Sequence, residues 1–167
     1  MLGQILKIFK ALNSNARPWQ LSLGVCLGAI LGLTPLLSLH NSAVIFIALI
    51  LNVNIGITIV SGVVFAGFAY LLDPIFHQLG YTLLKAEGLQ GFWTQFFSFP
   101  IFILAKLNNT IVMGSLIASL LLAIPLFFIF NVFVEKYRVS FSKFLEKFPV
   151  FKALKVVKIY QTLIGGK

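Results

Sequence analysis

The stretch LSLGVCLGAILGLTPLLSLHN, residues 21–41, decides which class of fold this chain adopts. It contains no Asp, Glu, Lys or Arg, and Gly24, Gly28 and Gly32 recur at every fourth position, on one face of a helix. Glycines at this spacing let a second backbone approach closely, as helices do in lipid. We therefore predict an apolar helix that packs through these glycines and Pro35, either within the chain or in a homo-oligomer.

The composition of the whole chain also indicates a lipid environment. Of its 167 residues 59% are hydrophobic and 10% are charged, whereas soluble proteins average about half apolar and a quarter charged. So few charges cannot cover the outside of a soluble domain of this size. The sequence predicts a single-domain, all-α integral membrane protein.

The charges are unevenly placed as well as few. There are 13 Lys and Arg against 4 Asp and Glu, and most basic residues lie before residue 18 or after residue 135. By the positive-inside rule both termini then face the cytoplasm, and the chain crosses the membrane an even number of times. Nucleic-acid binding is disfavoured, because aromatic residues are not interspersed with the basic ones on a solvated surface.

About four hydrophobic segments follow from the hydropathy pattern, some of them broken or re-entrant. A membrane domain over 1–134 begins with an amphipathic interfacial helix over 1–16 and is followed by a basic amphipathic tail over 135–167. The hydrophobic segments are 18–36, 42–72, 92–105 and 110–134, with an interfacial helix and loop over 73–91.

Two topologies fit residues 18–72. In the first, which we prefer slightly, 18–36 and 42–70 are antiparallel spans. In the second, 18–51 form a re-entrant helical hairpin and 55–72 make the first crossing. The apolar residues 92–105 are either a thin tilted span or a second re-entrant piece.

Six polar residues near or within the apolar segments form the candidate membrane site. Unpaired polar groups are costly in hydrocarbon, so these side chains either cap broken helices or contact a lipid headgroup or a polar solute. Asp73 has three further interpretations: a helix cap, an interfacial partner of Lys85 or Arg17, or a proton-coupling carboxylate. The six are His40, Asn41, Asn52, Asn54, Asp73 and His77.

Catalysis, metal binding and cofactors have no support in the motifs. No catalytic triad order, paired carboxylates or phosphate-binding glycine loop is recognisable, and the spacing of His40, Asp73 and His77 matches no metal site. The single Cys26 cannot form an internal disulfide. We expect the bilayer itself, and its anionic headgroups, as partners of the basic tail, through Lys136, Lys143, Lys147, Lys152 and Lys155.

The sequence also resembles a known family. Residues 23–41, with 51–54 and 71–80, are similar to a family of small bacterial membrane proteins that carries only a domain-of-unknown-function label. The resemblance covers about residues 15–85 and rests on matching Gly, Pro, Asn and His positions. It implies a bacterial inner-membrane location and a role near lipid or envelope assembly, and it transfers no activity.

Three functions remain as hypotheses. The first is a non-enzymatic inner-membrane component that handles lipid or envelope lipid transport, with an envelope protein partner. The second is a small oligomeric transporter or channel subunit for a polar solute. The third, an enzyme acting on a membrane-embedded substrate, needs titratable groups converging in one cleft.

Overall fold

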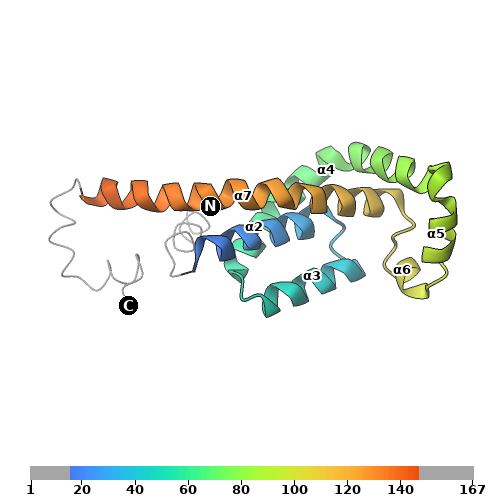
Figure 1. Ribbon diagram of the computed structural model, residues 1–167, viewed down its shortest axis with the longest axis horizontal. Helices are drawn as coiled ribbons and strands as arrows, with labels where there is room; N and C mark the ends of the chain where they lie inside the picture. Colours follow the sequence, from blue (N-terminus) through green and yellow to red (C-terminus); the bar gives the residue numbers. More distant parts are fainter. Residues whose placement is uncertain (1–15, 147–167) are drawn as a thin grey trace.

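The computed structural model describes residues 16–146, and within them every regular element is a helix, which confirms the all-helical prediction (Figure 1). The interfacial helix predicted over 1–16 falls almost entirely outside these residues, as does the tail beyond Glu146. The helices are α2 (Pro18–Leu33), α3 (Leu39–Ile50), α4 (Ile55–Lys85), η1 (Glu87–Leu89), α5 (Gln90–Phe96), α6 (Pro100–Leu104) and α7 (Thr110–Glu146).

Helices α2 and α3 form a hairpin, residues 18–51, whose two ends lie at the same level. Gly24 of α2 lies against the start of α4 and Gly32 lies against residues two to three turns further along it, so α2 and α4 run parallel. The side-chain amide of Gln20 donates to the carbonyl oxygen of Asn52 (3.2 Å), which joins the entry of the hairpin to its exit. A helical hairpin over 18–51 is part of the second predicted topology, whereas the slightly preferred topology has a single span over 42–70 antiparallel to 18–36.

The apolar segment 42–72 is two helices and not one. It breaks at Leu51–Asn54, where Asn52 adopts a positive φ of 49°. Asparagine tolerates this left-handed conformation better than most residues, and one such residue ends a helix. The second helix, α4, then runs through Asp73 and Pro74 to Lys85. Residues 73–91 therefore begin with a helix, as predicted, but this helix continues α4 and is not a separate interfacial element.

Residues 92–105 form no span. They contain the end of α5 and the whole of α6, which have seven and five residues. At about 1.5 Å per residue neither helix can cross a hydrocarbon core about 30 Å thick. Phe96 and Phe102 stack across the break between them, with ring centroids 3.9 Å apart. The α5–α6 segment, residues 87–109, lies at the far end of the molecule from the start of α2 (Figure 1).

Helix α7 returns antiparallel to α4 and extends past the boundary predicted at residue 134. Near its start, Gly114 meets the backbone of Phe76 and Gly80; towards its end, Val134 packs in one cluster with Ile57. These contacts are so close that a Cβ on Gly80 or Gly114 would overlap backbone atoms of the facing helix. Helix α2 packs against both α4 and α7, so these three helices form the centre of the molecule.

Two helices, α4 and the Thr110–Ser140 part of α7, are long and apolar enough to cross a membrane by length and composition. Only 11% of the most apolar stretch of each is buried within the molecule, and large aliphatic and aromatic side chains cover its outside. A soluble protein rarely exposes so large an apolar surface.

Candidate functional site

The predicted polar residues His40 and Asn41 lie at the turn of the α2–α3 hairpin. Asn41, only 2% exposed, donates from Nδ2 to the carbonyl oxygen of Pro35 (3.0 Å). The Thr34 hydroxyl lies 2.8 Å from Asn41 Oδ1 and 2.7 Å from the Ile30 carbonyl oxygen, and donates to one of them at a time. His40 Nε2 pairs with the Ser38 hydroxyl at 2.9 Å. Asn41 therefore supplies a hydrogen-bond donor to backbone carbonyl oxygens that follow the end of α2.

The second polar pair, Asn52 and Asn54, lies at the turn from α3 into α4. Asn54 Oδ1 accepts a hydrogen bond from the backbone N–H of Ile57 (3.0 Å), and so caps α4. Asn52 contributes its left-handed backbone and its carbonyl oxygen to this turn. The contacts described for both residues hold the chain reversal in place.

Asp73 and His77 lie well away from the turn that holds Asn52 and Asn54, and no described hydrogen bond joins them to His40 or Asn41. They are on the second half of α4, and Asp73 is 19 residues beyond Asn54, about 28 Å along the helix axis at about 1.5 Å per residue. His77 Nδ1 shares a hydrogen bond of 2.7 Å with the Thr110 hydroxyl, which ties α4 to the start of α7. The six predicted residues thus form three separate groups. Within residues 16–146 no three His, Cys, Asp or Glu side chains are placed to hold a metal ion together.

The glycines predicted as a packing face lie on the side of α2 that faces α4. A Cβ on Gly28 would overlap the Ser61 hydroxyl and lie 2.5 Å from the Thr58 carbonyl oxygen, and one on Gly32 would overlap the Gly62 carbonyl oxygen. Their packing in this structure is therefore intramolecular. Pro35, which we grouped with them, instead lies exposed in the turn after α2.

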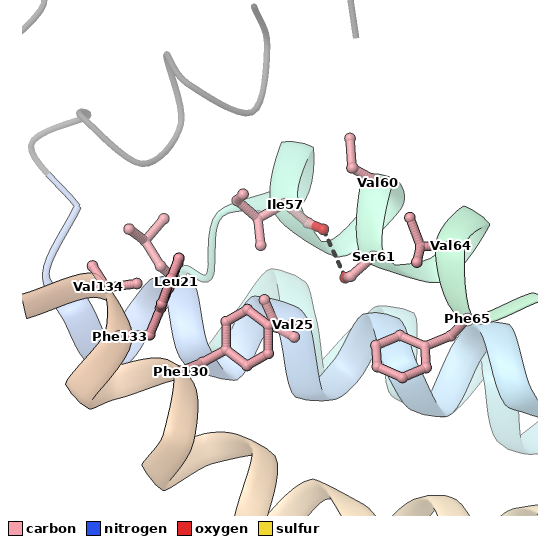
Figure 2. Close-up of a pocket in the computed structure, with 10 residues that line it drawn as sticks. All are labelled: Leu21, Val25, Ile57, Val60, Ser61, Val64, Phe65, Phe130, Phe133 and Val134. Atoms are coloured by element: carbon pink, nitrogen blue, oxygen red, sulfur yellow. Dashed lines mark hydrogen bonds between the residues drawn. The ribbon is translucent and has the colours of Figure 1, made fainter. Parts of the chain in front are cut away.

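An apolar cavity of about 350 Å³ lies where α2, α4 and α7 meet, and its size is typical of ligand pockets. Figure 2 shows its walls: two residues from α2, five from α4 and three from α7. The only side-chain polar atom among them is the Ser61 hydroxyl, which donates to the Ile57 carbonyl oxygen (2.7 Å). The lining residues are Leu21, Val25, Ile57, Val60, Ser61, Val64, Phe65, Phe130, Phe133 and Val134.

This cavity opens at the side of the molecule. Val64 of α4 and Phe133 of α7 are 52% and 51% exposed, whereas Leu21, Ile57 and Val134 at its inner wall are buried. An open, apolar wall without an unpaired side-chain polar group can hold a hydrocarbon chain and offers nothing to polarise a bond. Sequence reasoning missed this site because its residues are the same types that cover the rest of the apolar surface.

Of the lysines predicted to face anionic lipid, Lys136 lies exposed on α7, on the part of that helix beyond the cavity. Lys143 is on the last turns of α7, where only the backbone is described. Lys147, Lys152 and Lys155 lie outside the described residues.

Comparison with known proteins identifies relatives by sequence. An uncharacterized protein of Treponema pallidum (strain Nichols) is 27% identical over 138 residues, which cover 83% of this chain and 85% of that protein. No solved structure matches the chain. The family described as an uncharacterized protein conserved in bacteria (DUF2062) matches residues 2–142, which confirms the resemblance to an uncharacterised bacterial family. The chain belongs to the DUF2062 family.

Proposed function

We propose that this chain is a multi-pass protein of the bacterial inner membrane that binds membrane lipid without catalysing a reaction. In this proposal α4 and α7 cross the bilayer, and the α2–α3 hairpin and the α5–α6 segment enter it from opposite sides. The length and apolar exposure of α4 and α7 support the two crossings. Both termini then lie on one side of the membrane.

The distribution of charge supports the orientation. Arg17, Lys136 and Arg138 lie at the end of the molecule where α2 begins and α7 leaves the core, and further basic residues precede and follow them in the sequence. Lys85, Glu87 and Lys106 lie at the opposite end, around the α5–α6 segment. The positive-inside rule places the more basic end in the cytoplasm.

The lateral apolar cavity carries the functional part of the proposal. Its walls have the chemistry of an acyl-chain site, and its mouth between Val64 and Phe133 faces the surface that the bilayer would cover. A transporter for a polar solute would need the six polar residues along one path, whereas the described contacts divide them among three places. Lipid handling is the function that these observations support best.

Native mass spectrometry of the full chain, extracted gently from its membrane, tests this proposal. We expect retained phospholipid, and a marked loss of it in Val64→Trp, whose indole would fill the cavity mouth. Val63→Trp is the matched control, because Val63 is the neighbouring residue, is 71% exposed and does not line the cavity. Equal lipid retention in the two variants would contradict the proposal; a co-purifying envelope protein would identify the partner.

A further inference from the structure

The apolar cavity occupies one end of the apolar part of α4. The uncharged stretch of this helix covers residues 55–72 and ends before Asp73, and the lining residues, within 57–65, extend from near its start to about its middle. Eight residues of helix rise about 12 Å, which is less than half of a hydrocarbon core about 30 Å thick. The cavity therefore fits within one leaflet.

The other two helices place the cavity at the same level. On α2 the lining residues are Leu21 and Val25, in the first half of that helix. On α7 they lie within 130–134, at the end of the uncharged stretch 110–134 and directly before Glu135. All three helices thus put the cavity in the leaflet on the side where α2 begins, which is the side that we place in the cytoplasm.

The volume of the cavity corresponds to one hydrocarbon chain. An apolar protein cavity of about 150 Å³ can hold benzene, with its six carbons, so a cavity of about 350 Å³ has room for roughly fourteen carbons. A second chain of similar length would need about as much volume again.

The shape of the cavity determines how a chain can enter. Its mouth lies at the side of the molecule, between Val64 and Phe133, whereas the buried side chains of Leu21 and Val134 close the end nearest the start of α2 (Figure 2). A lipid can therefore insert one chain sideways while its headgroup and any second chain stay in the bilayer.

We propose that the cavity takes a single acyl chain of a lipid from the cytoplasmic leaflet, through the mouth between Val64 and Phe133. This inference rests on the proposed lipid-binding function and orientation, and it adds the number of chains and the leaflet. None of the lining residues is charged, so the site selects the chain and not the headgroup. A single-chain lipid should then bind as readily as one chain of a phospholipid.

Photolabelling from each face of the membrane tests the proposal. The probe is lysophosphatidylcholine whose single chain ends in a diazirine, added in the cold to sealed inside-out or right-side-out vesicles from cells that produce the full chain. Its zwitterionic headgroup crosses hydrocarbon slowly, because leaving water is costly for charged groups, so the probe stays in the leaflet that receives it. Mass spectrometry of the irradiated and digested protein then locates the label.

We expect label on Val25 and Ile57 from inside-out vesicles, because these residues are 7% and 6% exposed and are reached through the cavity. Right-side-out vesicles should lose this label and show label on Leu71 instead, which is 74% exposed in the other half of the uncharged stretch of α4. Val64→Trp should remove the label on Val25, and Val63→Trp should leave it unchanged.

The other outcomes separate this inference from the function on which it rests. Labelling of Val25 from both faces, or from the right-side-out face alone, would contradict the leaflet and leave lipid binding standing. If native mass spectrometry shows Val64-dependent retention of a two-chain phospholipid while the probe labels neither Val25 nor Ile57, the single-chain site is wrong and lipid binding again stands. If neither lipid depends on Val64, lipid binding itself fails and the cavity belongs to another apolar segment, such as one of a second copy. Should Val64→Trp not fold, the comparison of the two faces with the wild-type chain decides.

Discussion

The α2–α3 hairpin and the α5–α6 segment reverse the chain at opposite ends of α4, and they use different chemistry to do so. Each leads through one residue with positive φ, Asn52 (49°) or Lys106 (56°), into a long apolar helix capped by an asparagine side chain. The hairpin is held by glycines and buried hydrogen bonds. The α5–α6 segment is held by stacked aromatic rings.

This difference predicts how each region responds to change. At Gly28 a rotation of the Ser61 hydroxyl would not be enough, because the Thr58 carbonyl oxygen belongs to the backbone, so added atoms must displace a helix. Rings packed on rings can adjust, and each aromatic pair adds only about 0.5–1.5 kcal/mol beyond its buried area. The hairpin should therefore be intolerant of substitution and the α5–α6 segment tolerant.

The largest expected effect is on the labelling of introduced cysteines, which reports topology: a given cysteine either reacts or does not. In a Cys26→Ala background, Gly88→Cys, at the start of the α5–α6 segment, should react with a membrane-impermeant maleimide in intact cells. Leu37→Cys should not react, although Leu37 is 95% exposed, because in the proposed topology the hairpin turn stops within the bilayer. Lys136→Cys serves as the cytoplasmic control, reactive only after permeabilisation. Labelling of Leu37→Cys in intact cells would show that α2 crosses the membrane.

The next effect is on stability, at Gly28. We expect Gly28→Ala to destabilise the chain by about 1–3 kcal/mol, because its Cβ would overlap atoms of Ser61 and Thr58. Thermal unfolding of the purified protein in detergent measures the change. Gly67→Ala is the control: Gly67 is also helical, a Cβ there meets nothing within 4 Å, and alanine favours the helix by up to about 1 kcal/mol. If both variants unfold alike, the glycine face does not hold α2 to α4.

Loss of the Asn41 hydrogen bonds should destabilise the chain by an amount similar to, or somewhat smaller than, that expected for Gly28→Ala. Asn41→Leu keeps the branched shape of the side chain but leaves the Pro35 and Leu36 carbonyl oxygens without their amide donor, at a cost of about 1–3 kcal/mol. Ser42→Ala, at the exposed neighbouring position, should change the melting temperature little. A melting temperature of Asn41→Leu at or above that of the wild-type chain would show that the turn does not depend on this amide.

Sequence reasoning identified the helical class, the family and the close-packing glycines, because composition and spacing alone carry those signals. It misplaced the helix ends between residues 42 and 91. Asn52 breaks the helix by adopting a left-handed backbone, which asparagine permits and does not require, whereas Pro74 lies inside α4 without ending it. Contacts that support α4 on both sides of Pro74, such as Gly80 against Thr110, come from α7, 30 residues further along the chain.

The candidate site was less predictable than the fold. Asn41 and Asn54 were predicted as site residues because they are polar residues in an apolar sequence, yet their described contacts are to nearby backbone and, for Asn41, to the Thr34 hydroxyl. Apart from Ser61, the cavity is lined by Val, Leu, Ile and Phe, which are indistinguishable in type from the residues that cover α3 and α4. Only the crossing of three helices distinguishes them, and no local pattern encodes that crossing.

The smallest effect tests the tolerance of the α5–α6 segment. Trp93 donates from Nε1 to the Leu83 carbonyl oxygen (2.8 Å) and lies among Phe92, Phe96 and Phe97. Trp93→Phe keeps a ring in the cluster and removes one hydrogen bond, which should cost about 0.5–1.5 kcal/mol. Trp19→Phe, at the half-exposed start of α2, is the matched control and should melt like the wild-type chain. If Trp93→Phe melts lower than Gly28→Ala, this aromatic cluster is as rigid as the glycine face, and the contrast between the two regions fails.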